Sequence, residues 1–73
     1  MSLGQQHRRL LGEAVRSRRR HLKLTQEKLA EKSGLSTVFI SRIECAKESP
    51  SLDSLVKIAR ALGVKVRDLV QDC

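Results

Sequence analysis

Apolar residues along this chain of 73 residues recur at intervals of three and four, and no segment alternates with the period of two that is typical of a strand. Five segments follow the helical spacing, so the sequence predicts an all-α fold. The first expected helix covers roughly residues 7–22. Leu11, Val15 and Leu22 share one face of it and are expected to point into the core.

The next two expected helices are short and are separated by a tight turn. Thr25 and Ser36 each precede one of them and suit the N-cap position, because their hydroxyls can accept a backbone N–H. Gly34 lies between the two and suits the left-handed residue that ends a helix. The third helix is expected to run to Glu44 or Cys45.

The outward face of this third helix is polar and basic. Ile40 and Ile43 anchor the helix to the core, and a step of about 100° per residue turns the opposite face toward a partner. That opposite face carries Val38, Ser41, Arg42 and Cys45, flanked by Thr37. Two short helices joined by a tight turn, the second with such a face, are the layout of a DNA-reading helix-turn-helix.

Two more helices are expected in the last third of the chain. The fourth begins after Ser51, since Pro50 blocks backward extension and the serine hydroxyl can cap the helix. Gly63 ends it. Its wide apolar surface consists of Leu52, Leu55, Val56, Ile58, Ala59 and Leu62. Lys65 is a poor N-cap for the short fifth helix, which we therefore expect to fray.

The charge of the chain is unevenly distributed. We expect one domain at residues 7–73 behind a disordered tail at residues 1–6, with a net charge of +7 for the whole chain. Residues 1–24 hold seven Lys or Arg against one acidic residue, whereas residues 25–73 hold eight against seven. Such a basic domain favours a polyanion, most commonly nucleic acid, although a solvated helix face would give the same pattern.

The sequence lacks the residue patterns that other classes of function require. No Cys–His, Ser–His–Asp or paired-carboxylate arrangement appears, so we expect no enzyme and no small-molecule ligand. Cys45 and Cys73 are too few for a disulfide scaffold and neither forms a zinc pattern with a histidine, so we expect free thiols in a reducing cytoplasm and no metal or other cofactor. No apolar run approaches a membrane span. The single aromatic residue, Phe39, argues against single-strand binders that stack bases on aromatic side chains.

Four segments together form a specific signature that covers roughly Leu11 to Leu69. They are VRSRRR, TQEKLAEKSGLS, ISRIE and PSLDSLVKIARALGV. In these segments the chain resembles the Cro/C1 (XRE) helix-turn-helix family, which includes the lambdoid phage repressors and small restriction-modification controller proteins. The resemblance implies a compact five-helix, lambda-repressor-like DNA-binding domain whose third helix enters the major groove of DNA.

The resemblance also implies which residues bind DNA. The base-reading positions of the family fall on Thr37, Val38, Ser41 and Arg42. Its phosphate-contacting positions fall on Gln26, Arg16, Arg18, Lys47 and Ser49. Arg42 could pair with guanine, and Gln26 at a helix start suits a phosphate. The alternative for each of these residues is an ordinary solvent-exposed side chain.

Other positions implied by the resemblance concern the fold. Arg19 and Glu44 are expected to form a partly buried salt bridge that locks the first helix to the third. Lys23 and Ala46 stand where the family commonly has glycine, and each would cost up to about 1 kcal/mol if the position needs a positive φ. Cys45 replaces a frequent arginine or polar residue, which puts one phosphate contact in doubt.

A homodimer is expected because one such module presents a single recognition helix, whereas two-fold dimers read two half-sites about 34–36 Å apart. The expected dimer patch consists of Leu62, Val66, Leu69 and Val70. The alternative is that these residues only close the monomer core. The leading hypothesis is therefore a sequence-specific, double-stranded DNA-binding transcriptional regulator. The other is a protein- or RNA-interaction module, of the bridging-factor or antitoxin type, on the same fold.

Overall fold

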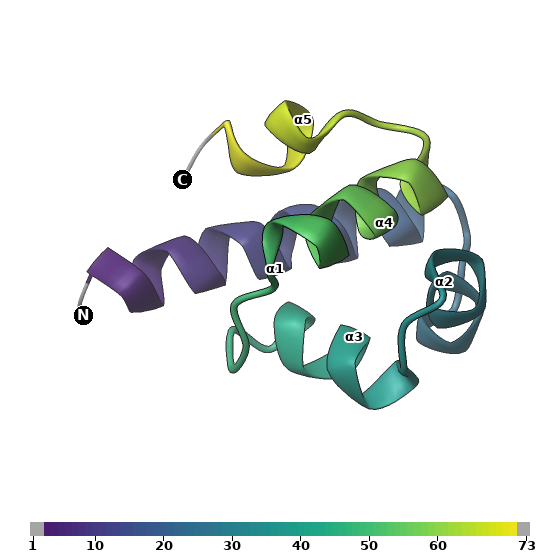
Figure 1. Cartoon of the computed structure of the whole chain (residues 1–73), viewed down its shortest axis with the longest axis horizontal. Helices are drawn as coiled ribbons and strands as arrows, with labels where there is room; N and C mark the ends of the chain where they lie inside the picture. Colours follow the sequence, from purple (N-terminus) through teal and green to yellow (C-terminus); the bar gives the residue numbers. More distant parts are fainter. Residues whose placement is uncertain (1–2, 72–73) are drawn as a thin grey trace.

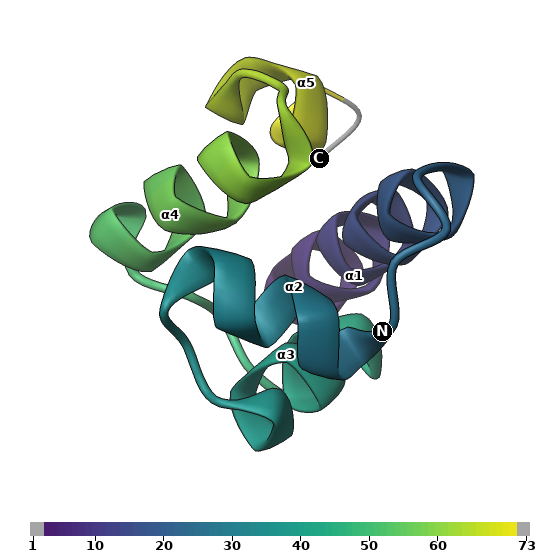
Figure 2. The same cartoon turned by 90° about the vertical axis from the view of Figure 1, so that its right-hand side faces the viewer.

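Helices form all of the regular structure in the computed structural model, which describes residues 3–71 (Figure 1). Within that range the chain has no strand, so the predicted all-α fold is confirmed. The helices are α1 (Leu3–His21), α2 (Gln26–Ser33), α3 (Thr37–Glu44), α4 (Leu52–Leu62) and α5 (Val66–Val70). Two views at right angles place α5 at the end of the molecule opposite α3 (Figures 1 and 2).

Helix α1 begins at Leu3, earlier than the expected start near His7. The expected disordered tail at residues 1–6 is therefore wrong for residues 3–6, which are helical. Extending an existing helix by one turn costs much less free energy than starting a new helix. In addition, the two glutamines before His7 are good helix formers. Residues 1 and 2 lie outside the described part of the chain, as does Cys73.

The core lies where the first four helices meet, and α5 closes one side of it. Its buried apolar side chains are Leu11, Val15, Leu29, Ala30, Ile40, Ile43, Leu55, Ile58, Ala59, Leu62 and Leu69. Leu22 was expected among them, but it is 44% exposed. Helix α1 ends at His21 and the chain turns at Lys23, so Leu24 packs against the core in its place. No helix among the described residues is both long and apolar enough to cross a bilayer.

Each of the helices α1 to α4 is followed, one or two residues after its end, by a residue in the left-handed conformation. Two of these residues are glycines, Gly34 (φ 74°) and Gly63 (φ 70°), and two are not, Lys23 (φ 59°) and Ala46 (φ 62°). At each of these four helix ends, the backbone N–H of the left-handed residue and the N–H of the residue after it donate to carbonyl oxygens of the preceding helical turn. This is the Schellman arrangement, in which a positive φ satisfies carbonyls that would otherwise lack a partner.

The predicted N-caps are confirmed. The hydroxyls of Thr25 and Ser36 each accept a backbone N–H at 3.0 Å, and that of Ser51 accepts one at 3.1 Å. Lys65 supplies no such side-chain acceptor to α5. Instead, its own backbone N–H donates to Oδ2 of Asp68 at 2.9 Å, a local contact that supports the first turn of α5 and that the sequence pattern had not indicated.

Gly12 lets α1 approach the end of α3 at backbone distance. A Cβ atom added at Gly12 would lie 2.4 Å from the carbonyl oxygen of Ile43 and 3.0 Å from that of Glu44. Both neighbours are backbone atoms, so neither can rotate away. Nothing in the hydrophobic pattern singled out this glycine, because the requirement comes from a helix that is distant in the sequence.

We expect Gly12→Ala to lower the free energy of unfolding, because the backbones of α1 and α3 would have to separate. Overpacking of this kind typically costs about 1–3 kcal/mol, which outweighs the gain of up to about 1 kcal/mol that alanine brings to a helix. Urea unfolding followed by circular dichroism measures the change. Ser17→Ala, at an exposed position of the same helix, is the control and should have little effect. A Gly12→Ala variant as stable as the parent would contradict the close approach.

We expect Lys23→Gly and Ala46→Gly each to raise the free energy of unfolding by up to about 1 kcal/mol, because glycine adopts a positive φ without the strain of a Cβ atom. Thermal unfolding of the single and double variants checks this. Gly34→Ala is the converse control: a Cβ at Gly34 meets no atom within 4 Å, so any loss of stability there reports backbone strain alone. Stability that falls in both glycine variants would refute the argument.

Candidate nucleic-acid interface

Helices α2 and α3 with the turn at Gly34 form a helix-turn-helix whose second helix lies at the surface (Figure 2). Leu29 from α2 and Ile40 and Ile43 from α3 are completely buried, so both helices are fixed to the core by large side chains. The position of α3 is therefore set by packing on its inner side. Its outer side is left free for a partner.

The four candidate base-reading residues share this outer side. With a step of about 100° per residue, one arc of roughly 140° around α3 contains all four of them, in the order Thr37, Ser41, Val38 and Arg42. Ile40 and Ile43 lie outside this arc, on the inner side of the helix. Val38 is 69% exposed. Arg42 is also exposed, whereas Thr37 and Ser41 are half-buried. The structure thus brings the four predicted residues together.

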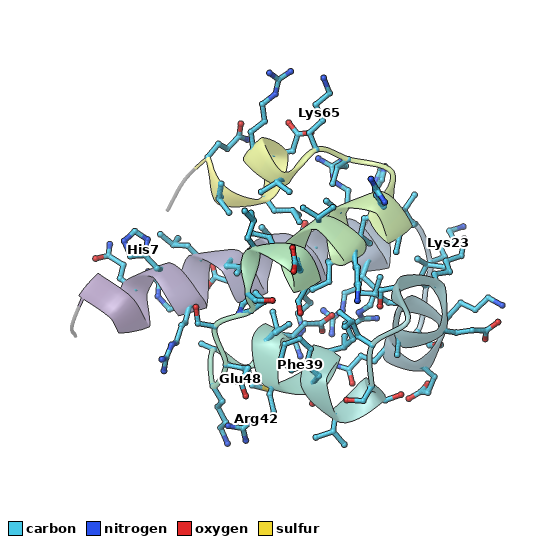
Figure 3. The ribbon with its side chains drawn as sticks, in the orientation of Figure 1. His7, Lys23, Phe39, Arg42, Glu48 and Lys65 are labelled. Atoms are coloured by element: carbon cyan, nitrogen blue, oxygen red, sulfur yellow. The ribbon has the colours of Figure 1, made fainter. Side chains whose placement is uncertain are left out.

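Arg42 points away from the body of the protein, beside Glu48 (Figure 3). Its Nε donates to Oε1 of Glu48 at 3.1 Å, and its Nη2 donates to the carbonyl oxygen of Lys47 at 3.2 Å. Glu48 was not among the candidate residues, since an acidic side chain in a loop carries no signal for DNA binding. Its contact with Arg42 became visible only in the structure.

A buried ion pair joins α1 to the last residue of α3. Arg19 Nε lies 2.7 Å from Glu44 Oε2, and Arg19 Nη2 donates to Glu44 Oε1 at 3.0 Å. The Glu44 side chain is fully buried and that of Arg19 is 10% exposed. Arg19 Nη1 also donates to the carbonyl oxygen of Leu24 at 2.7 Å. Both charges are therefore paired and hydrogen-bonded, which is the condition for burying them.

The hydrogen bond to Glu44 raises the pKa of the Arg19 guanidinium above its ordinary value, and burial offsets part of that rise. A raised pKa in the folded state gives stability that is complete below the unfolded-state pKa and is lost only as the pH rises through the folded-state value. Because an arginine titrates far above neutrality, Arg19 contributes its full stabilisation across the physiological range.

Two residues that are predicted to contact phosphate, Gln26 and Arg16, lie beside the Glu44 carboxylate. Gln26 Nε2 donates to Glu44 Oε1 at 3.1 Å, and Arg16 Nε lies 3.7 Å from that oxygen. Glu44 thus orients Gln26 at the first position of α2, where backbone N–H groups without helical partners face outward. Arg16 keeps 47% of its side chain exposed. The structure places these two side chains beside the end of α3.

The other predicted phosphate contacts are more scattered. Lys47 and Ser49 are exposed and follow directly after α3. Arg18, by contrast, lines a polar hollow of about 330 Å³ between α1 and α5, together with Asp68 and Leu69. A separation of two residues turns Arg18 about 200° around α1 from Arg16. The placement of Arg18 with the other candidates is therefore corrected, because it faces α5 and not α3.

The expected dimer patch is also corrected in part. Leu62 and Leu69 are each 3% exposed in a single chain, so they belong to the monomer core. Only Val66 and Val70 of the predicted set keep part of their surface accessible. The pattern of apolar residues could not distinguish a residue of the monomer core from a residue of the dimer contact. A short helix uses the same apolar positions for both roles.

No three His, Cys, Asp or Glu side chains in the described part of the chain come close enough together to hold a metal ion. Cys45 is an exposed free thiol at the end of α3. It lies next to Glu44 in the chain and carries no predicted DNA contact.

We expect Glu44→Ala to lower the free energy of unfolding by about 3–5 kcal/mol, because Arg19 would keep a buried charge without its partner. The measurement is urea unfolding at neutral pH. Glu13→Ala is the control: it removes an exposed carboxylate that pairs with Arg9, and such pairs contribute about 0–1 kcal/mol. An unchanged melting temperature for Glu44→Ala would rule out a structural role for the pair.

Comparison with known proteins adds independent findings. A family model described as helix-turn-helix (HTH_3) matches residues 15–69. The chain is 42% identical over 64 residues to the control protein C.BamHI of Bacillus amyloliquefaciens, across 86% of this chain and 79% of that protein. It is 40% identical over 60 residues to the immunity repressor protein of Bacillus phage phi105, across 82% of this chain but only 42% of the repressor.

The fold of the chain is also similar to that of a solved structure. The P22 c2 repressor, crystallised with a synthetic operator, superposes with a TM-score of 0.82 and 33% identity, across 88% of this chain and 97% of that one. The family match at residues 15–69 covers the end of α1, all of α2, α3 and α4, and the turn between α2 and α3.

Proposed function

This chain belongs to the helix-turn-helix family HTH_3, and we propose that it is a regulator of transcription that binds specific sequences of double-stranded DNA as a homodimer. The family and its named members are DNA-binding regulators and not enzymes. The observation that carries the proposal is the outer side of α3, where Val38 and Arg42 are exposed on a helix whose inner side is fully packed.

The outer side of α3 suits the major groove of DNA. That groove is about 12 Å wide and admits one α-helix, whose diameter is about 10–12 Å. Arg42 carries the fork of donors that pairs with guanine O6 and N7. The Val38 side chain and the Thr37 methyl group suit the methyl group of thymine, and the Ser41 hydroxyl can bond to either a base or a phosphate.

Phosphate contacts would hold α3 in register. The first N–H groups of α2 and the Gln26 side chain, oriented by Glu44, make an anion site at a helix N-terminus. Arg16, beside Glu44, and Lys47 and Ser49, in the loop after α3, would extend that contact at the C-terminal end of α3. Contacts of this kind fix orientation and supply affinity that depends strongly on salt, whereas sequence discrimination comes from the base edges.

A homodimer follows from the size of the site. One α3 covers about half of a typical operator, and a second copy related by a two-fold axis would place another α3 about 34–36 Å away. The similar P22 c2 repressor was crystallised with an operator, which supports DNA as the partner. With Leu62 and Leu69 in the core, we propose that the accessible parts of Val66 and Val70 on α5 contribute to the contact between copies.

Selection from a randomised pool of DNA duplexes, at two salt concentrations, tests the proposal. We expect enrichment of a palindrome whose half-sites lie about one helical turn apart. Arg42→Ala should then lose discrimination at one base pair of each half-site, at a cost of about 1–3 kcal/mol. Arg60→Ala is the matched control, because it removes the same charge from an exposed position in the last turn of α4, outside the proposed base-reading, phosphate and dimer contacts.

Binding that falls steeply with salt but enriches no motif would contradict a sequence-specific regulator, since phosphate contacts alone would then explain the affinity. A preference for RNA over duplex DNA would favour the interaction-module hypothesis instead. Equal effects of Arg42→Ala and Arg60→Ala would mean that Arg42 acts only through its charge.

A further inference from the structure

Arg42 is held in place before any DNA is bound. Two of its donor groups are engaged, Nε by the Glu48 carboxylate at 3.1 Å and Nη2 by the Lys47 carbonyl oxygen at 3.2 Å (Figure 3). Both partners come from the loop between α3 and α4. The side chain therefore has a defined orientation although 49% of it is exposed.

The loop that carries Glu48 is itself fixed to α3. The N–H of Lys47 donates to the carbonyl oxygen of Arg42 at 2.8 Å, and that of Ala46 donates to Ile43 at 3.1 Å. This turn depends on the positive φ of Ala46. Glu48 is thus the first residue after a hydrogen-bonded turn, and its position relative to Arg42 is set by the backbone.

The engaged atoms leave one edge of the guanidinium open. The Nε–H and one N–H of Nη2 form the side edge of the group, and Nε and Nη2 are the two atoms that donate to Glu48 and Lys47. The end edge, formed by Nη1 and the other N–H of Nη2, keeps free donors from the group's total of five. An end edge offers two parallel N–H groups, which is the arrangement needed for guanine O6 and N7. Glu48 and guanine can therefore bind Arg42 at the same time.

The pair has little value for stability. Glu48 and Arg42 keep 38% and 49% of their side chains exposed, and exposed ion pairs contribute little to folding. The carboxylate would also lie beside a DNA backbone of the same charge, where it weakens binding to every sequence. Its effect is to restrict the rotamers of a flexible arginine, which lowers the entropy that a base contact must overcome.

We propose that Glu48 is a specificity-determining residue: it positions the Arg42 guanidinium so that its end edge reads a base, and its negative charge reduces sequence-indifferent binding. This inference rests on the proposed function, since it assigns a partner to the same base-reading residue. It makes Glu48 a positioning residue that acts through Arg42 and not a direct contact with a base.

Three variants of the full chain separate the two effects of Glu48. Glu48→Ala removes both the acceptor and the charge, whereas Glu48→Gln keeps an oxygen that can accept from Nε but removes the charge. Glu31→Ala is the control, because it removes an exposed carboxylate that pairs with Lys28 on α2. Binding is measured with the selected duplex, with the same duplex altered at the Arg42-dependent base pair, and with an unrelated duplex.

We expect Glu48→Ala to lose about two- to fivefold of the discrimination between the first two duplexes, a part of the roughly 5- to 150-fold lost in Arg42→Ala. Glu48→Gln should keep most of it. Both should bind the unrelated duplex more tightly than the parent does, by a factor that shrinks at high salt. In the Arg42→Ala background, Glu48→Ala should cause no further loss of discrimination. Glu31→Ala should leave discrimination unchanged.

Two results would overturn the inference. One is unchanged discrimination in Glu48→Ala. The other is a loss at a base pair that Arg42→Ala does not affect, which would mean that Glu48 reads a cytosine directly. If the parent selects no motif, the proposed function fails, and the positioning remains testable in the free protein. The Nε–H signal of Arg42 in NMR spectra should be protected from solvent exchange in the parent and in Glu48→Gln and exposed in Glu48→Ala; equal exchange in all three would refute the positioning.

Discussion

The carboxylate of Glu44 joins three helices, and the arrangement of the proposed DNA-binding surface depends on it. Glu44 is the last residue of α3, and its carboxylate accepts from Nε and Nη2 of Arg19 on α1 and from the side-chain amide of Gln26 at the start of α2. A charge that is fully buried must keep such partners, because its desolvation is costly without them. The requirement fixes the end of α3 relative to Gln26 at the start of α2, the proposed anion site. Stability and recognition geometry therefore share one contact.

The close approach at Gly12 is the steric counterpart of this ion pair. A side chain at Gly12 would push α1 away from the last turn of α3 and would separate Arg19 from Glu44. The left-handed residues then set the directions of the connecting loops. At Ala46 the chain accepts backbone strain in order to turn directly after α3, and this turn brings Glu48 beside Arg42. Strain of this kind persists only where the surrounding structure holds it.

The outer side of α3 combines a rigid base with two exposed side chains, Val38 and Arg42, and two half-buried hydroxyl side chains, Thr37 and Ser41. The rigidity comes from Ile40 and Ile43, which are completely buried, and from the cap at Ser36. A site supported in this way loses little entropy on binding, because its orientation is already set. In the proposed regulator, Glu48 extends the same principle from the backbone to the Arg42 side chain. Charge elsewhere on the domain then acts mainly on affinity and its dependence on salt.

The existence of the helices and their caps could be predicted from the sequence, because they follow from local hydrogen bonding and from the period of apolar residues. The family could be predicted from the resemblance of four segments. Thr25, Ser36, Ser51, Gly34 and Gly63 were each identified from their own chemistry and their neighbours. The outward face of α3 followed from helical geometry alone. Only the tertiary structure decided the burial of Leu62 and Leu69, the exposure of Leu22, the need for glycine at position 12 and the pairing of Arg42 with Glu48. Each of these depends on where a second element lies in space, and the period of a helix carries no information about what packs against it.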